Sequence, residues 1–371
     1  MEDSLTAKPQ RLYSLDTLRG FDMFWIMGLG NVITKIAEAS GSLFWISFSN
    51  QFEHPIWNGF TFWDLIFPLF MFMAGVSTPY SIGRELAKGK SKGKLMVRVI
   101  KRGIILILLG MIYNNGLELR PVSDFRFPSV LGKIGATYMF ANIIYLYAGK
   151  KMQWVWFWGF LVGYWLLLKF TSAPGYLPGD LTEPGNFMSY LDRTILPGRL
   201  SRGIHDTVGL ICTIPGISNV LLGIFAGQLL KNNQVMQTLK VKWLTIGGVI
   251  SIALAMLWSL DFPFNKNLWS SSFVLLTGGI SLILLALFYY VIDVKGYKRW
   301  TLFFRVIGMN SILIYMSPVF VNWGHIAKSF FKWLGQLAGT PYDQIILGIC
   351  AILIQWLFLY YLYKKKTFLR I

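Results

Sequence analysis

Apolar segments about 20 residues long recur from one end of the chain to the other, and this repetition constrains the fold more than any other feature. A segment of this length and composition is typical of a helix that crosses a membrane. Charged residues make up only 14% of the sequence, whereas an ordinary soluble domain contains roughly 25%. We therefore predict an all-α fold, a polytopic membrane helical bundle in which residues 1–371 form a single transmembrane domain.

The apolar runs predict about ten transmembrane helices. We expect them at residues 20–38, 60–82, 96–116, 131–149, 153–170, 207–230, 243–260, 270–292, 304–322 and 345–363. The third is the weakest, because its strongly apolar part extends only from Gly103 to Tyr113. The aromatic segment at 323–344 is predicted to hold an interfacial helix.

The net charge of +18 could indicate a nucleic-acid partner, but the positions of the cations argue against one. Lysine and arginine occur in short runs between the apolar segments, which is the pattern that sets membrane topology. A cytoplasmic N-terminus puts most of the 35 cations in cytoplasmic connections, including Lys8, Arg11 and a run of eight at 84–102. An even number of spans returns the C-terminus to the cytoplasm. We expect the chain in the cell (inner) membrane, with the loop at 40–58 outside.

Several polar side chains lie within or beside the apolar runs, where burying an ionised group costs roughly 2.5–3.5 kcal/mol or more. Such residues are retained when they face a cavity or a partner. Asp16 and Arg19 also fit a helix-start acid and a positive-inside anchor. Asn310 and Ser311 also fit hydrogen bonding between helices. The full set is Asp16, Arg19, Asp22, Asn31, Asp64, Asn310 and Ser311.

The segment QFEHPIWNGFTFWDLIFPLFMFMAG places one of the three histidines just before an apolar run that contains an acid. His54 and Asn58 both precede the run, four positions apart, and Asp64 lies inside it. Histidine titrates near neutrality and takes protons from amines or hydroxyls, and a carboxylate can orient or charge-balance its ring. We predict that His54 and Asp64 are catalytic, with His205 and Asp206 as the alternative pair. The histidines are not spaced as a metal site, so no metal is predicted.

Six segments of the chain, taken in order, form a wider sequence pattern. They are RLYSLDTLRG, FEHPIWNGFTFWDLIFPLFMFMAG, RFPSVLGKIGATYMF, DTVGLICTIPGISNVLLGIFAG, NKNLW and VIDVKGYKRWTLFFRVIGMNSILIY. Together they resemble the heparan-α-glucosaminide N-acetyltransferase family of transmembrane acetyltransferases. The match runs from about residue 11 to residue 316. The chain looks like a bacterial-type member without the family's additional N-terminal lumenal portion.

This resemblance implies transfer of an acetyl group from cytosolic acetyl-CoA, the co-substrate, to the amine of a terminal glucosamine-type sugar on the other side of the membrane. It also implies that His54 is the active-site histidine, because the family's histidine lies in the loop before a W-N-G-x-T segment. The matched motifs and the polar groups of the apolar runs supply the candidates for binding substrate or acetyl-CoA. These are Asp16, Arg19, Asn31, Asn58, Arg126, Lys133, Asn310 and Ser311.

The sequence departs from the family pattern at two places. Both departures bear on the identity of the acceptor more than on the type of reaction. The family's V-L-Q-R-[IL]-G reads VLGKIG here, so Lys133 stands where an arginine could make a bidentate contact with a phosphate or carboxylate. After G-M-N-S-I-L-x-Y the family often has a histidine, whereas this chain has Met316, Ser317 and Pro318.

Two other functions stay open on the sequence. One is an O-acyltransferase of a cell-envelope polysaccharide, and the other is a transporter of a solute or a lipid-linked sugar, which would also carry intramembrane polar residues. The expected partners are acetyl-CoA, an amino-sugar or glycan acceptor and the lipid bilayer, with a homodimer as an open alternative. The cations at 84–102 fit either a topology anchor or attraction of CoA phosphates. The long outer connection 171–206 is expected to be functional or disordered.

Overall fold

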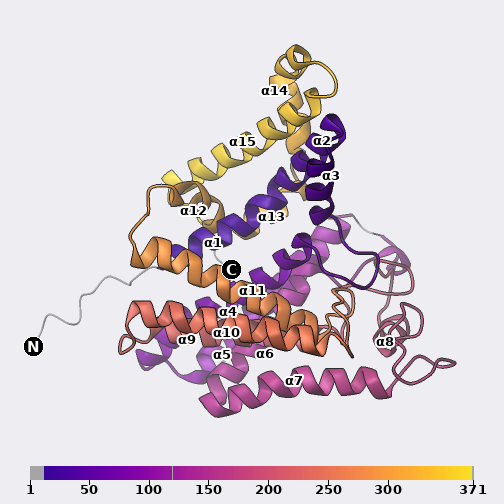
Figure 1. Cartoon of the computed structure of the whole chain (residues 1–371), viewed down its shortest axis with the longest axis vertical. Coiled ribbons are helices and arrows are strands. Elements are labelled where there is room, and N and C mark those ends of the chain that lie inside the picture. The colour runs from indigo at the N-terminus through magenta and orange to yellow at the C-terminus, as the bar shows by residue number, and fades with distance from the viewer. Residues whose placement is uncertain (1–11, 119, 370–371) are drawn as a thin grey trace, which may run out of the picture.

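The computed structural model describes residues 12–118 and 120–369, and over these ranges the chain is a bundle of helices joined by loops (Figure 1). No β-strand forms among the residues described, and one isolated bridge pairs Arg126 with Gly198. The predicted all-α fold is therefore confirmed.

The helices differ in length, and short 3₁₀ or π segments, labelled η, interrupt or extend several of them. In chain order they are α1 (Tyr13–Phe24), η1 (Trp25–Leu29), α2 (Gly30–Ser40), α3 (Leu43–Ser49), η2 (Asn50–Phe52), α4 (Phe62–Ala87), α5 (Lys92–Asn115), η3 (Val122–Asp124), α6 (Val130–Tyr147), α7 (Lys150–Phe170), α8 (Phe187–Ile195), α9 (Thr213–Lys231), α10 (Gln237–Trp258), α11 (Ser271–Phe288), η4 (Tyr289–Val294), α12 (Thr301–Met309), α13 (Ser311–Met316), η5 (Ser317–Val319), α14 (Trp323–Ala338) and α15 (Asp343–Lys364).

Every predicted span overlaps a helix or a run of two or three successive helical segments. Five helices are long and apolar enough to cross a membrane, namely α4, α9, α10, α11 with η4, and α15. The pair α12 and α13 makes a sixth if the two form one span, which is bent by 69° at their junction. The described residues therefore supply five or six candidate spans. The other transmembrane helices of the predicted ten stay a prediction.

The other predicted spans fall on helices whose sequences depart from a simple apolar cylinder. The first is interrupted, because α1 has 12 residues and gives way to η1, where Gly28 has a φ of 131°. The third lies on α5, whose first half carries Arg98, Lys101 and Arg102. Its apolar part is the short stretch that the sequence predicted.

Helices α4 and α9 form the centre of the bundle and approach each other through glycines. A Cβ on Gly75 would collide with the carbonyl of Val220, and a Cβ on Gly223 would collide with the carbonyl of Phe72. Small residues allow membrane helices to pack backbone against backbone in this way. The packing holds α4 firmly at the centre, which matters because its N-terminus carries the candidate site.

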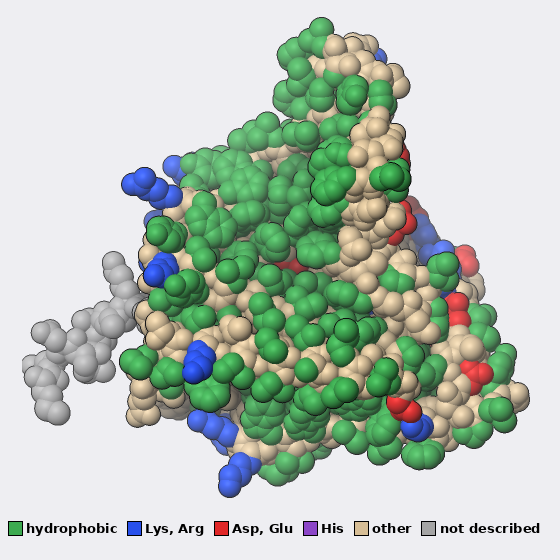
Figure 2. Space-filling model, in the orientation of Figure 1, with side chains coloured by type: hydrophobic (Ala, Val, Ile, Leu, Met, Phe, Trp, Pro, Cys, Tyr) green, Lys and Arg blue, Asp and Glu red, His purple; other side chains and the backbone are tan. Residues whose placement is uncertain are grey.

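Burial separates central from peripheral helices. In the most apolar window of α4 and of α9, 72% of the residues are buried inside the protein, whereas the figure is 22% for α10 and for α15. Hydrophobic side chains cover most of the face seen in Figure 2. An apolar exterior on helices of this length is the surface that lipid would contact.

Two connecting regions differ in character from the spans. The segment predicted to hold an interfacial helix does contain one helix, α14, which projects with α15 at one end of the molecule (Figure 1). The long connection 171–206 contains α8 and is packed rather than loose, because Ser189, Asp192 and His205 within it are fully buried. Its alternative assignment as a disordered loop is wrong.

Candidate active site

The N-terminus of α4 explains how an acid is accommodated at the start of an apolar helix. Thr61 is the N-cap residue, and its backbone N–H donates to Asp64 Oδ2 at 3.1 Å, so that the two residues form a capping box. Such caps satisfy backbone groups that have no partner inside the helix. The second carboxylate oxygen, Oδ1, lies 2.7 Å from Nδ1 of His54. Asp64 therefore links the helix end to the histidine.

A lysine from a distant part of the chain completes this group. Lys266 lies in the loop between α10 and α11, and its Nζ is 3.4 Å from Asp64 Oδ1. The same Nζ lies 3.2 Å from Nδ1 and 3.1 Å from Nε2 of His54. The Asp64 side chain is fully buried, that of Lys266 is 20% exposed and that of His54 is 48% exposed. The imidazole is thus the member of the group that solvent or substrate reaches most readily.

Burial lowers the pKa of Lys266 below its usual value of 10.5, and the negative charge of Asp64 opposes that shift. A carboxylate, an ammonium group and an imidazole therefore share one small volume. The charge of Lys266 therefore depends on the carboxylate beside it, and such coupling is common at catalytic sites.

Hydrogen bonds between two loops hold His54 and Lys266 together. The side-chain amide of Asn265 donates to Asn58 Oδ1 at 2.9 Å, and the backbone N–H of Gly59 donates to the carbonyl of Phe264 at 2.8 Å. Asn58, predicted as a binding residue, therefore fastens the histidine loop to the lysine loop in this structure.

A cavity of about 310 Å³ opens beside this group, between α1, α4, α6 and α13. His54, Lys266 and Arg126 contribute polar groups, and apolar side chains such as Phe67 and Phe70 form most of the wall. Two further polar residues, Asp22 and Ser311, also line it. An apolar pocket with a few convergent polar groups is the usual form of a small-molecule site. Of the predicted residues, His54, Arg126 and Ser311 meet here, with Asp64 directly behind His54.

A larger cleft of about 950 Å³ adjoins the cavity and is lined by residues of η1, α2, α13, α14 and α15. Met23, Ile26 and Tyr315 line both spaces. Asn31, a predicted binding residue, faces the larger one, as does Lys328. The two spaces are therefore neighbours separated by a few side chains.

Four predicted residues make their contacts away from the cavity wall. Arg19 pairs with Asp16 at 3.8 Å and donates to Ser77 of α4 at 3.0 Å. Asn310 bonds to the backbone of Thr367 and Leu369. Lys133 is the fourth, and it too is buried away from the cavity.

Lys133 is buried on the side of α6 that faces α9 and the lysine loop. Its Nζ lies 3.2 Å from Cys212 Sγ and 3.7 Å from the centre of the Trp269 ring. A cation over an aromatic face is stabilised by the ring's quadrupole. The ammonium group that replaces the family's arginine therefore contacts a thiol and an indole.

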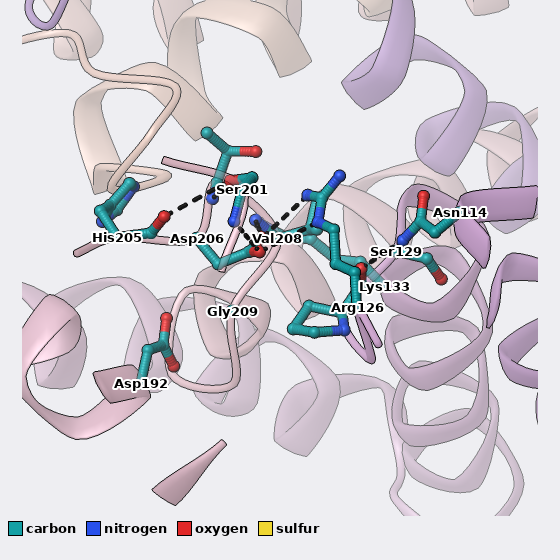
Figure 3. A network of polar contacts seen from close by, with 12 residues as sticks. Asn114, Arg126, Ser129, Lys133, Asp192, Ser201, His205, Asp206, Val208 and Gly209 are labelled. Atoms are coloured by element: carbon teal, nitrogen blue, oxygen red, sulfur yellow. Dashed lines mark hydrogen bonds and ion pairs between the residues drawn. The ribbon is translucent and has the colours of Figure 1, made fainter. Parts of the chain in front are cut away.

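A second polar group links Arg126 of the cavity wall to the packed connection 171–206 (Figure 3). Arg126 contacts both carboxylate oxygens of Asp206 at 3.1 Å. His205 Nδ1 is 2.7 Å from the hydroxyl of Ser189, and its Nε2 has no hydrogen-bond partner among the described residues. His205 and Asp206, the alternative catalytic pair, thus turn to different partners, and both are fully buried.

Asp192 and His205 predict an unusual dependence of stability on pH. Burial raises the pKa of Asp192 to about 7 and lowers the pKa of His205 to about 4. At a pH between its unfolded and folded pKa values, Asp192 is protonated in the folded protein and ionised in the unfolded chain. At a pH between its folded and unfolded pKa values, His205 is neutral in the folded protein and protonated in the unfolded chain. The two contributions to the pH slope of the unfolding free energy have opposite signs and largely cancel between about pH 4 and 6.5.

Substituting one of the two residues should therefore reveal the pH dependence of stability that the other residue causes. In Asp192→Asn the melting temperature is expected to fall as the pH is lowered from 6.5 to 4, because only the histidine contribution remains. In His205→Gln it is expected to fall as the pH is raised from 4 to 7. Thermal unfolding in detergent across this range checks both, and two variant profiles parallel to that of the unmodified protein would contradict the assignment.

No protein-family model matches the chain. It is 31% identical to heparan-alpha-glucosaminide N-acetyltransferase of Mus musculus, over 100% of this chain and 63% of the relative. It is 30% identical to heparan-alpha-glucosaminide N-acetyltransferase of Homo sapiens, over 99% of this chain and 61% of the relative. The chain resembles heparan-α-glucosaminide N-acetyltransferases along its whole length. It spans less than two thirds of the length of these curated relatives, and the resemblance inferred from six short motifs is confirmed.

Sequence reasoning missed Lys266 as a member of the candidate site. The motif NKNLW, which contains it, was already part of the resemblance to heparan-α-glucosaminide N-acetyltransferases. A lone cation in a short loop between two apolar runs was the available signal. Asp22 was recognised as a polar residue of the first apolar run, but its place on the cavity wall follows only from the packing of α1. No group of three or more His, Cys, Asp or Glu able to hold a metal ion occurs in the part of the chain described.

Proposed function

We propose that this protein is a multi-pass membrane acetyltransferase that moves an acetyl group from cytosolic acetyl-CoA to the amine of a terminal glucosamine-type sugar on the opposite side of the membrane. The observation that carries the proposal is the group of His54, Asp64 and Lys266 at the edge of a largely apolar cavity. The resemblance to heparan-α-glucosaminide N-acetyltransferases supports the type of reaction.

The proposed topology has ten spans in one transmembrane domain of the cell membrane, with both termini in the cytoplasm. Lysine and arginine side chains lie mainly along the left edge of the view in Figure 2, and acidic side chains mainly along the right edge, which supports an orientation set by positive charge. His54 then faces the outer side, because it precedes α4 while the cation-rich turn at 84–102 follows that helix.

In the proposed reaction the sugar amine attacks the thioester carbonyl, a C–N bond forms and the C–S bond breaks. With Nδ1–H donating to Asp64, Nε2 of His54 keeps a lone pair that accepts the proton of the amine. The same nitrogen then returns this proton to the CoA thiolate, so that the histidine ends unchanged. In the alternative version, Nε2 first accepts the acetyl group from CoA and then passes it to the amine, with the same products.

Lys266 has a separate proposed role. Its ammonium group lies 3.1 Å from Nε2, so when the acyl carbon is attacked beside that nitrogen, the negative charge that develops on the acyl oxygen falls within reach of a positive charge. A donor that meets developing negative charge in a water-poor site is among the largest contributions to acyl transfer. The neighbouring cleft, which Asn31 lines, supplies space for the acceptor. Arg126 and Ser311 are proposed to contact the substrates inside the cavity, and the other predicted residues to position its walls.

Sealed proteoliposomes with labelled acetyl-CoA on one side and a panel of amino sugars on the other test this proposal. We expect labelled amide on a glucosamine-type acceptor when acetyl-CoA is presented to the side of the cation-rich turn. Label in an ester bond would favour the O-acyltransferase, and sugar uptake without label would favour a transporter. Failure to consume the thioester with any nucleophile would refute the enzyme.

A further inference from the structure

A separate groove of about 360 Å³ lies between α7 and α10 and shares no lining residue with the catalytic cavity. Residues of α9 and α11 also line it, and several of them, such as Leu222 and Leu275, are buried and form its floor. Three tryptophans, Trp154, Trp158 and Trp243, are exposed along its rim. The groove is therefore a surface feature of the apolar exterior.

The length of this groove matches the depth of one lipid leaflet. Its lining residues on α10 run from Trp243 to Leu254, which are 11 positions apart, or about 16 Å along the helix axis. The hydrocarbon core of a bilayer is about 30 Å thick, so one leaflet contributes about 15 Å. Apart from indole N–H groups, Ser251 is the one polar group among the lining side chains, and its hydroxyl already donates to the carbonyl of Leu275 at 2.8 Å. An acyl chain fits such a lining.

The two ends of the groove differ. Beyond Leu254, α7 and α10 come together, because the rings of Trp165 and Trp258 are 5.7 Å apart and Trp165 Nε1 donates to Asp261 Oδ2 at 2.7 Å. At the opposite end, near the starts of α7 and α10, the groove meets a group of lysines. In the proposed topology this end lies at the cytoplasmic surface.

Two exposed lysines flank the groove at that end. Lys150 begins α7 and lies one helical turn before Trp154, so the two residues share a face of the helix. Lys242 directly precedes Trp243 on α10. Each wall of the groove therefore carries a cation next to a tryptophan of the rim.

A third lysine, Lys240, is buried at the same end. Its Nζ donates to the carbonyl of Leu230 at 2.7 Å, and Leu230 directly follows a residue of the groove floor on α9. An ammonium group has three N–H donors, so the other two have no partner among the described residues. The ammonium group of Lys240 thus lies where the apolar floor ends.

The charges at this end are unbalanced. No Asp or Glu occurs at 127–179 or at 207–260, the two stretches that contain α7, α9 and α10. None of Lys150, Lys240 and Lys242 forms an ion pair within the ranges that the structure describes. Cations gathered without counter-charges favour a negatively charged ligand.

We infer that this groove binds an anionic phospholipid, with one acyl chain along α10 and the phosphate among Lys150, Lys240 and Lys242. Basic pockets between membrane helices commonly hold such head groups, and cytoplasmic leaflets are rich in anionic lipid. Lysines at helix ends also fix topology, but that role requires no apolar groove ending beside them. The inference goes beyond the proposed reaction and does not depend on it.

Lys150→Gln/Lys242→Gln tests the inference, because both side chains are exposed and make no contact that the fold needs. Native mass spectrometry of the protein in detergent gives the Kd of added phosphatidylglycerol and of phosphatidylcholine. We expect the unmodified protein to prefer phosphatidylglycerol by about 10–30-fold, and the double variant to lose this preference, as for removal of two lysines from an anionic head group. Lys150→Arg/Lys242→Arg, which keeps the charge, should retain it.

Lys88→Gln/Lys94→Gln is the matched charge control, since these exposed lysines lie in the turn after α4 and line no part of the groove. Its preference for phosphatidylglycerol should equal that of the unmodified protein. Equal affinity of the unmodified protein for the two lipids would overturn the inference. An equal loss in the two glutamine double variants would overturn it too, in favour of long-range attraction.

Gly247→Phe tests the acyl-chain part of the groove. A Cβ at Gly247 would meet only Leu282, at 3.8 Å, so the new ring has room to fill the groove without displacing the backbone. We expect the affinity for phosphatidylglycerol to fall at least about tenfold, since excluding even two methylene groups from an apolar site has this effect. Gly163→Phe is the control, because a Cβ there meets nothing within 4 Å and Gly163 lies outside the groove. Unchanged binding in Gly247→Phe, or an equal loss in Gly163→Phe, would overturn the assignment of the groove.

Discussion

His54→Ala is expected to reduce acetyl transfer by at least about 10²–10⁴-fold, the usual contribution of a positioned general base. The Kd of free CoA should not change, because free CoA carries no acyl group on which the imidazole could act. The protein should also remain folded, since the imidazole is half exposed and Asp64 keeps its bond to Thr61. Turnover with labelled acetyl-CoA, CoA calorimetry and thermal unfolding in detergent measure the three properties.

His325→Ala is the control, because that histidine is exposed at the start of α14 and its ring has no hydrogen bond or ion pair among the described residues. Its activity should match that of the unmodified protein. Transfer by His54→Ala at the unmodified rate would end the catalytic assignment. Incubation with labelled acetyl-CoA alone distinguishes the two mechanisms, because label retained on the protein, and absent in His54→Ala, indicates an acetyl-histidine intermediate.

The contact between His54 and Asp64 could be anticipated because it is local. The two residues are ten positions apart, and the intervening Thr61 caps the helix that carries the acid. Lys266 could not be placed in the same way, because it approaches from a loop 212 positions away. Its position depends on how α10 and α11 pack, and hydrophobic periodicity does not encode that packing in a single sequence.

The helices were largely predictable because apolar runs of membrane length are a strong signal, whereas their interruptions were not. Gly28 breaks the first predicted span through a positive φ, and the junction after Met309 bends the ninth. Lys133 shows the limit for side chains. A cation in an apolar run predicts a partner, but only the assembled helices show that the partners are Cys212 and Trp269.

At pH values where Lys266 is protonated, Lys266→Gln is expected to lower the rate by about 10²–10³-fold, the usual effect of removing one oxyanion donor. In the unmodified protein the rate should decline in alkaline solution as Lys266 loses its proton. This decline should begin below pH 10.5, because burial lowers the pKa of Lys266 from that value. In Asp64→Asn the decline should move to lower pH, because the negative charge that raises the pKa of Lys266 is lost.

Lys266→Arg separates this role from simple packing, because a guanidinium stays charged throughout the accessible range. The variant should keep part of the activity of the unmodified protein and show no alkaline decline. An alkaline decline at the same pH in Lys266→Arg and in the unmodified protein would assign that ionisation to another group. Full activity in Lys266→Gln would remove the lysine from the reaction altogether, and it would leave stabilisation of the oxyanion to hydrogen-bond donors of the cavity wall such as Ser311.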